Sequence, residues 1–171
     1  ISMVEGSAVA ALGLLLQTSG LNQTERYTVE CKLIPEELGH NHMLAEWGKK
    51  WFGPRPAPLA YAAVIQRDAL AVSHLDYQFR FPFILASVYW NEKNTLRSGD
   101  QILSVLEMVS KDATNDFRQL LDEERGHVTW LDGVLKRLEG NTHTLRMFQR
   151  CLEMSKRVYP VMVHHAHSKA W

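Results

Sequence analysis

The chain has 171 residues, of which 46% are hydrophobic, enough for one domain with a substantial core and too few for two. Its 19 lysines and arginines balance its 19 acidic residues, and no stretch gathers the basic ones on one face, so nucleic acid is not indicated as a partner. The longest apolar run, Ala8 to Leu16, is shorter than the roughly 20 residues that cross a bilayer, so no transmembrane segment is expected.

The cysteines and the start of the chain favour a reducing compartment. Cys31 and Cys151 lie far apart in the sequence and form no Cys-x-x-Cys pair, so free thiols are expected rather than a disulfide. The first apolar run has no basic segment before it and no small-residue cleavage site after it, as a signal peptide would. We therefore expect a cytoplasmic protein. Because Glu5 lies so close to the first residue, the sequence leaves open whether the N-terminus is truncated.

The first part of the chain has the apolar spacing of two helices. One is expected over Ile1 to Gln17, with a turn after it, and the second from about Thr24 to Phe52, where a linker from Gly53 to Pro58 ends it. Pro35, followed by two acids, is also how a helix begins. Because the apolar spacing stays in register on both sides of Pro35, we expect one continuous helix that bends there.

The second part is expected to hold the remaining helices. Leu59 to about Tyr77 is predicted as a helix or helical crossover, and Pro82 should break or kink the next helix. The stretch Arg97-Ser98-Gly99-Asp100 is a predicted interruption, and residues 112–116 are predicted to form a turn. A helix from about Asn115 to Glu139 and a last one over about 142–168 complete the chain. No strand-like alternation is present, so residues 1–171 should form a single all-α domain.

One motif occurs twice. The pentapeptide Glu-Glu-x-Gly-His spans residues 36–40 and 123–127, and another glutamate precedes the second glutamate of each copy by 32 positions. Helix residues three apart share a face, so each Glu-x-x-His can offer a carboxylate and an imidazole to one ion. Four carboxylates and two imidazoles on four helices form the ligand set of a dinuclear iron or manganese site. The predicted metal ligands are Glu5, Glu37, His40, Glu92, Glu124 and His127.

The positions of the two motifs support this interpretation. Both lie on apolar helix stripes, where a lone ionised carboxylate costs several kcal/mol or more unless it is paired, protonated or bound to a cation. Glu92 is the least secure ligand because the predicted interruption follows it closely. The alternatives for the fourth carboxylate are Asp76, Asp100 and Glu107.

The neighbours of the ligands have less certain roles. Glu36 and Glu123 lie off the ligand face, so they are either surface residues or partners of the ligand histidines. The repeated Gly39 and Gly126 are predicted to let two helices approach closely. Histidines outside the motifs are not predicted as ligands, and two tryptophans one or two turns from a ligand are candidates for lining a substrate pocket: His42, His164, His165 and His167, and Trp47 and Trp130.

These residues resemble the ferritin-like di-iron carboxylate superfamily. The resemblance is carried by Glu5, Glu37-Leu38-Gly39-His40, Glu92 and Glu124-Arg125-Gly126-His127, and it spans about residues 1–140. It implies a four-helix bundle with a long crossover between the second and third helices. The segment of about 142–168 would be an additional C-terminal helix.

This sequence differs from several branches of the superfamily, and these differences indicate which activity to expect. Ordinary storage ferritins lack the second Glu-x-x-His, bacterioferritin-like proteins carry a haem-ligand methionine where Leu38 stands, and rubrerythrins add a Cys-x-x-Cys module that is missing here. The radical-bearing subunit of ribonucleotide reductase would have tyrosine in place of Leu44. The aromatic-rich crossover and the extra helix look more like the oxygenases and hydroxylases of the superfamily.

The resemblance therefore implies a non-haem di-iron oxygenase or hydroxylase. Its cofactor would be two iron ions, with manganese as the alternative metal, and its partners O2, an external reductase or ferredoxin, and a small organic or carrier-bound substrate. A homodimer is one expected assembly. The second hypothesis is an iron-oxidising storage protein in a large multi-subunit cage. The third hypothesis is a structural helical bundle that binds no metal.

Overall fold

The computed structural model describes the backbone of residues 2–52 and 75–168, and the side chains of residues 8–51 and 75–156. In this part of the chain every regular element is a helix and there is no strand, as the sequence predicted. The elements are α1 (Ser2–Leu16), α2 (Gln23–Thr28), a π-helical turn (Val29–Leu33), α3 (Ile34–Phe52), α5 (Tyr77–Val109), α6 (Lys111–Arg137), a 3-10 turn (Leu138–Gly140) and α7 (Thr142–Ser168). The predicted linker and most of the predicted crossover, residues 53–74, lie outside the described residues.

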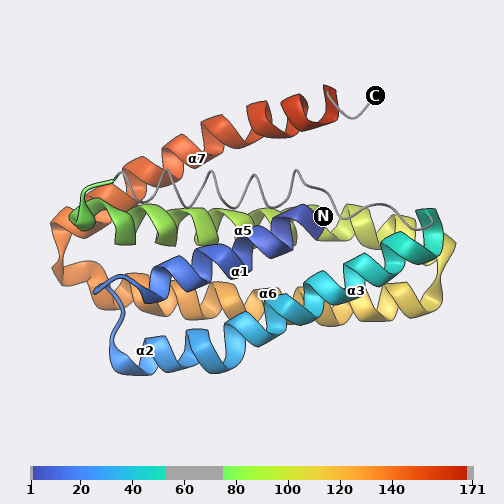
Figure 1. Cartoon of the computed structure of the whole chain (residues 1–171), viewed down its shortest axis with the longest axis horizontal. Coiled ribbons are helices and arrows are strands. Elements are labelled where there is room, and N and C mark those ends of the chain that lie inside the picture. Colours follow the sequence, from blue (N-terminus) through green and yellow to red (C-terminus); the bar gives the residue numbers. More distant parts are fainter. Residues whose placement is uncertain (1, 53–74, 169–171) are drawn as a thin grey trace.

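Four helices run side by side along the length of the molecule (Figure 1). Helix α1 packs on α3 and α5, and α6 packs on α5 and α3, so the four helices contact one another in a closed ring. Helix α7 lies outside this ring and packs against α5. In the part of the chain described here, no helix is both long and apolar enough to cross a membrane.

The predicted continuity of the second helix holds, because α2, the π-helical turn and α3 follow one another without a break. Asn22 begins this helix with a capping box: its side chain accepts from the Glu25 N–H at 2.9 Å, and the Glu25 carboxylate accepts from the Asn22 N–H at 2.8 Å. The widened turn lies directly before Pro35, which has no N–H for the helical ladder, and the Ile34 N–H reaches back to the Val29 carbonyl. A helix starting at Pro35 is therefore excluded.

Helix α5 corrects two predictions. It runs from Tyr77 to Val109 through Pro82, so the predicted break at Pro82 does not occur, while the kink predicted as the other outcome stays a prediction. Pro82 is only the sixth residue of the helix, and the hydrogen bond that it removes lies close to the helix start. The helix also passes through residues 97–100, where the sequence predicted an interruption.

The close helix approach predicted at Gly39 and Gly126 occurs at Gly99 instead. A Cβ atom on Gly99 would lie 2.8 Å from a Leu121 methyl carbon, so this glycine lets α5 and α6 pack closely. Among the described residues, a Cβ on Gly39 would meet no atom within 4 Å, and one on Gly126 would meet only the Lys32 Nζ at 3.9 Å. The prediction for Gly39 and Gly126 is therefore wrong.

The turn between α5 and α6 lies at Ser110, before the predicted turn at residues 112–116. The Ser110 backbone is extended, with φ −160° and ψ 121°, and its Oγ accepts from the Ala113 N–H at 3.3 Å. Asp112 and the residues after it belong to the first turns of α6. The prediction failed because acids and small polar residues are common both in turns and at helix N-termini.

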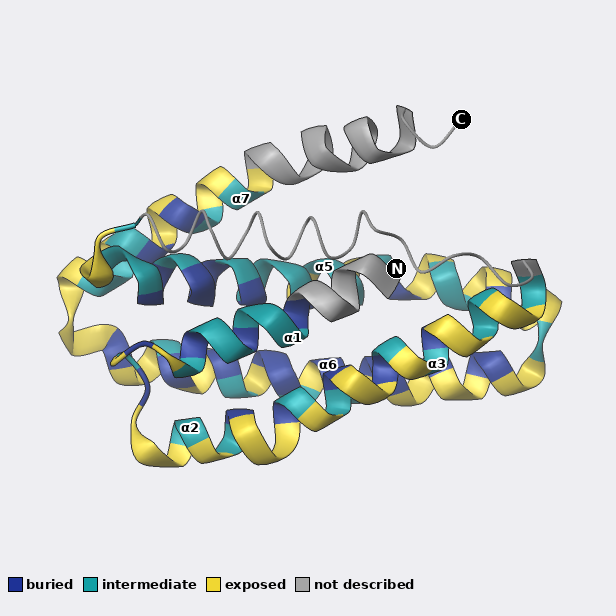
Figure 2. Cartoon of the chain, viewed as in Figure 1, coloured by how far each residue is buried: buried dark blue, intermediate teal, exposed yellow. Residues whose placement is uncertain are grey.

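Buried apolar residues form two clusters along the ring of helices, and α5 and α6 supply most of them (Figure 2). The large cluster lies at the α7 side and consists of Leu12, Leu15, Leu21, Val29, Leu33, Phe81, Ile84, Leu85, Ala86, Val88, Leu131, Val134, Leu138, Phe148 and Cys151. The small cluster consists of Leu106, Ala113, Phe117, Leu120 and Leu121. Between them on α3, α5 and α6 lies a layer of buried polar side chains.

Candidate metal centre

Five of the six predicted ligands lie in this buried polar layer. Helix α3 supplies Glu37 and His40, α5 supplies Glu92, and α6 supplies Glu124 and His127. Each is at most 4% exposed. The sixth, Glu5, belongs to α1, and its side chain lies outside the described residues.

The helix stripes explain why these polar groups are buried together. On α6, the ligand pair follows Leu120 and Leu121 of the small cluster and precedes Leu131 of the large one. Residues three or four apart on a helix share a face, so the packing that buries the leucines also buries the two polar groups between them. The apolar neighbours therefore position the site.

One imidazole faces three carboxylates. The Nδ1 of His127 lies 3.1 Å from an oxygen of Glu37, 3.4 Å from one of Glu124 and 3.6 Å from one of Glu92. Ligand atoms of these four side chains all lie within 4.8 Å of one another. Transition-metal ligands sit about 2.0–2.2 Å from the ion, so opposite ligands are about 4 Å apart. Small side-chain movements would thus let all four groups reach one cation.

The second imidazole, that of His40, faces two of the same carboxylates, Glu37 and Glu124. His40 Nδ1 is 3.5 Å from Glu124 Oε1 and 3.9 Å from Glu37 Oε2, and the two histidine rings are 6.1 Å apart. Glu37 and Glu124 each direct one oxygen towards His127 and the other towards His40. Two carboxylates therefore lie between two inward-facing imidazole nitrogens.

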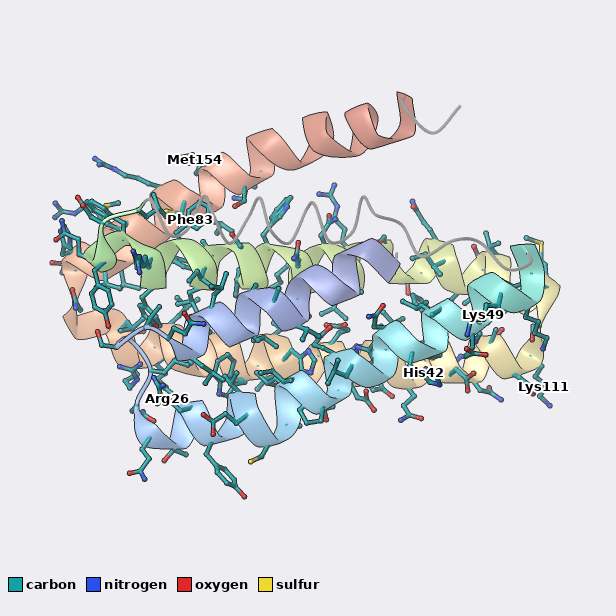
Figure 3. The ribbon with its side chains drawn as sticks, in the orientation of Figure 1. Arg26, His42, Lys49, Phe83, Lys111 and Met154 are labelled. Atoms are coloured by element: carbon teal, nitrogen blue, oxygen red, sulfur yellow. The ribbon has the colours of Figure 1, made fainter. Side chains whose placement is uncertain are left out.

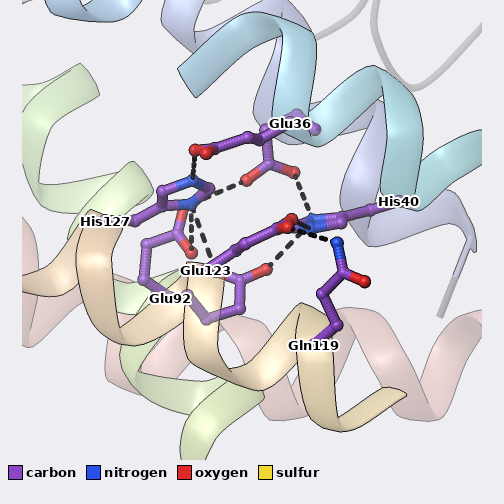
Figure 4. Close-up of polar contacts among 8 residues, drawn as sticks. Glu36, His40, Glu92, Gln119, Glu123 and His127 are labelled. Carbon is purple, nitrogen blue, oxygen red and sulfur yellow. Dashed lines mark hydrogen bonds and ion pairs between the residues drawn. The ribbon is translucent and has the colours of Figure 1, made fainter. Parts of the chain in front are cut away.

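The outer nitrogen of each histidine contacts the first glutamate of the other motif (Figure 4). His40 Nε2 lies 2.7 Å from Glu123 Oε2, and His127 Nε2 lies 2.9 Å from Glu36 Oε2. A histidine that donates its Nε2–H to a carboxylate presents the Nδ1 lone pair to a metal. Glu36 and Glu123, left open by the sequence, thus contact the histidines. The doubled acid in each motif was the signal, but the exchange of partners required the fold.

Burial and mutual contact perturb the protonation of the cluster. Burial, followed by the hydrogen bond with Glu124, raises the pKa of Glu92 well above its usual value. Burial opposes the charged form of His127, but its contacts with Glu124, Glu37 and Glu92 outweigh it and raise the pKa of this imidazole. The pKa of His40 is also raised, because contacts with Glu124 and Glu123 outweigh burial. Without metal, protons on these groups balance the buried carboxylates.

The hydrogen bonding of the carboxylates fits a bound cation. Glu37 is fully buried, and within the described part of the chain neither of its oxygens has a hydrogen bond of good geometry; the same is true of Glu124 Oε2. Buried carboxylate oxygens without donors are costly unless a cation lies against them. Carboxylates combined with imidazoles suit divalent metal ions, whereas thiolates would favour softer metals. The buried cluster can therefore hold a metal ion.

The alternative carboxylates lie away from this cluster. Asp76, Asp100 and Glu107 are all exposed, and Glu107 pairs with Arg118 at 2.7 Å. His42 is exposed on the outside of α3 (Figure 3). The side chains of His164, His165 and His167 lie outside the described residues.

The two tryptophans proposed for a substrate pocket pack in different clusters. Trp47 stacks near Trp51 and Phe117 beside the small cluster, with ring centroids 5.5 and 6.5 Å away, and Trp130 packs against the large cluster. A shallow surface depression of about 520 Å³, open to solvent, lies along α7 and is lined by Arg146, Gln149, Arg150, Glu153 and Met154. None of these lining residues belongs to the metal cluster, so the pocket role of the tryptophans stays a prediction.

Comparisons of the chain with models of protein families, with curated proteins and with solved structures found no match. Arguments about function therefore depend on the side chains of this chain.

Proposed function

We propose that the chain is a non-haem di-iron oxygenase or hydroxylase related to the ferritin-like superfamily. The observation that carries the proposal is the placement of Glu37 and Glu124 between the inward-facing nitrogens of His40 and His127. In the proposed site two iron ions are held by Glu5, Glu37, His40, Glu92, Glu124 and His127, and manganese is the alternative metal.

The helix arrangement supports this proposal. The six residues come from α1, α3, α5 and α6, the same helices that contact one another in a ring. We interpret the ring as a ferritin-like four-helix bundle, in which the chain between α3 and α5 is the long crossover.

The chain's own residues hold and shield the centre. Glu37 and Glu124 supply shared negative charge, Glu92 and Glu5 would complete the set of carboxylate ligands, and Glu36 and Glu123 orient the histidines. The apolar clusters on both sides keep bulk water from the polar layer. A bound iron pair would supply electrons for the reduction of O2, and the reduced oxygen would in turn oxidise a C–H, C=C or N–H bond of the substrate. The reaction then requires an external reductase or ferredoxin and a small organic or carrier-bound substrate.

Metal content and oxygen use test the proposal. We expect the metal-free chain to take up two Fe(II) ions under anaerobic conditions, and to consume O2 with a change in its optical spectrum when air is admitted. Glu37→Gln should lose most of this uptake. Glu46→Gln on the same helix is the matched control, because Glu46 is exposed and pairs only with Lys49 in the described structure.

Two results would redirect the proposal. If the wild-type chain binds neither iron nor manganese, the cluster is a structural ion-pair network and the proposal fails. If iron is oxidised and retained within a large cage of subunits and no organic substrate is oxidised, the storage function replaces the oxygenase.

A further inference from the structure

The two glutamates that contact the outer histidine nitrogens, Glu36 and Glu123, differ in their other contacts. Gln119 lies one helical turn before Glu123, and its Nε2 donates to Glu123 Oε1 at 2.9 Å, while the other oxygen of Glu123 contacts His40. Gln119, Glu123 and His40 thus form a chain of contacts from the surface of α6 to the buried layer (Figure 4). Both carboxylate oxygens of Glu123 have partners, which fixes its orientation.

The position equivalent to Gln119 in the first motif is Lys32, four residues before Glu36. Within the described part of the chain, Glu36 contacts His127 through Oε2, and no ion pair joins Glu36 to Lys32. The Lys32 amino group instead points across to α6, where it lies 3.9 Å from the place of a Cβ on Gly126. The first motif therefore lacks the support that the second has.

The local helix geometry explains the difference. Residues 119–123 lie within the α-helix α6, where side chains four apart meet on one face. Lys32 lies in the π-helical turn Val29–Leu33, where hydrogen bonds span five residues and a turn holds more residues than in an α-helix. The angle between Lys32 and Glu36 around the helix axis therefore differs from the angle between Gln119 and Glu123, and the Lys32 amino group lies beside Gly126 of α6. The turn before Pro35 thus breaks the equivalence of the two motifs.

We propose that Gln119 is a positioning residue that fixes the ring of His40 by holding Glu123, and that among the described residues the first motif has no equivalent support for His127. The proposal rests on the metal site of the proposed function. It implies that the two metal positions differ: the ligand at His40 is held in place before metal binds, whereas the ligand at His127 is oriented by Glu36 without further support.

Stepwise addition of Co(II) to the metal-free full-length chain tests this, because its visible absorption reports the ligand geometry at each ion. We expect two Co(II) ions in the wild type. Gln119→Ala should weaken one of them about twofold, and Gln119→Glu, which places a like charge beside Glu123, up to about fivefold. Glu123→Ala should weaken the same ion by about 10- to 100-fold. Each variant should alter only the spectral bands of that ion.

Two further variants separate positioning from a general structural effect. Gln119→Lys keeps a donor within reach of Glu123 and should restore wild-type Co(II) binding and spectrum. Lys32→Ala, the matched control in the first motif, should leave both ions unchanged. Gln119 is exposed, so the variants should fold, which circular dichroism of the metal-free proteins will verify.

The outcomes distinguish this inference from the proposed function. If the wild type binds two ions and Gln119→Ala and Gln119→Glu match it in affinity and spectrum, the positioning role is wrong and the metal site stands. An equal effect of Lys32→Ala would also overturn it. If the wild type binds no Co(II), iron or manganese, the proposed function fails and this inference fails with it.

Discussion

The two apolar clusters on either side of the polar layer differ in how completely they are closed. The large cluster includes Leu15, Leu85 and Leu131, which are fully buried, and α7 adds Phe148 and Cys151 to it. The small cluster has five buried members, and the side chains packed around it are only partly buried: Met43, Trp47, Trp51, Leu96, Ile102 and Leu103. Close to its end of α5, Met108 is 80% exposed.

This difference indicates where the stability of the described structure resides. Burial of apolar surface is the main favourable contribution to folding, so the end with the large cluster should open last and the end with the small cluster first. The metal ligands lie at the boundary. Glu37 and Glu124 are thus held from one side by a closed core and from the other by a looser one.

Truncation of the large cluster should have the largest effect. Leu131→Ala removes a fully buried side chain and should lower the free energy of unfolding by about 2–5 kcal/mol. Ile102→Ala, beside the small cluster and only partly buried, should cost about 1–2 kcal/mol. Urea denaturation followed by circular dichroism measures both. Equal losses would contradict the contrast between the clusters.

Adding a methyl group at the contact between Gly99 and Leu121 should have the next largest effect on stability. Gly99→Ala places a Cβ 2.8 Å from Leu121 of the small cluster and should destabilise the chain by about 1–3 kcal/mol. Gly39→Ala, where the Cβ meets nothing within 4 Å, should stabilise it by up to about 1 kcal/mol through helix propensity. Thermal unfolding of the metal-free proteins compares them. A destabilised Gly39→Ala would show that α3 needs this glycine for another reason.

The polar layer between the clusters should make the metal-free protein less stable as pH rises. The pKa values of Glu92, His40 and His127 are all raised in the folded chain, so the folded state holds more protons than the unfolded state near neutral pH. The stabilisation from the two histidines is fully present below the usual histidine pKa, and that from Glu92 below the usual glutamate pKa; each is lost as pH rises through the raised pKa of the folded chain. In the presence of a chelator, the urea concentration at the unfolding midpoint should therefore be lower at about pH 8 than at about pH 6.

Metal binding gives the control for this pH effect. A cation replaces the protons on the cluster, so the decrease in the urea midpoint between the two pH values should be smaller or reversed when metal is added. A metal-free midpoint that rises with pH would contradict the protonation of the buried layer.

The smallest expected effect concerns the reactivity of Cys151, which reports on the packing of the large cluster at that one position. Cys31 is exposed and should react rapidly with a thiol reagent, whereas Cys151 is buried and burial raises its pKa. Mass spectrometry after a short exposure should find one labelled cysteine, and two after denaturation. Leu131→Ala should speed the labelling of Cys151. Equal labelling of both in the native wild type would show that α7 does not close this end.

The sequence predicted the parts of this structure that follow from local periodicity. Apolar spacing identified the helices, and the repeated Glu-x-x-His with its preceding glutamate identified five described side chains that come together. Local signals failed where packing decides. The residues around Gly99 have the composition of a turn, yet contact with Leu121 keeps them helical. The pairing of Glu36 with His127 joins residues 91 positions apart, and only the packing of α3 beside α6 creates it.

Because each histidine contacts a glutamate of the other motif, neither motif alone contains all the residues that orient its own histidine. Glu36 orients a histidine of the second copy, and Glu123 one of the first. Loss of Glu36 or Glu123 therefore disturbs a histidine of the other copy. If the repeat arose by duplication, its single-copy ancestor needed a second identical chain to complete the same exchange. The present chain would then contain, in one polypeptide, what was once an association of two.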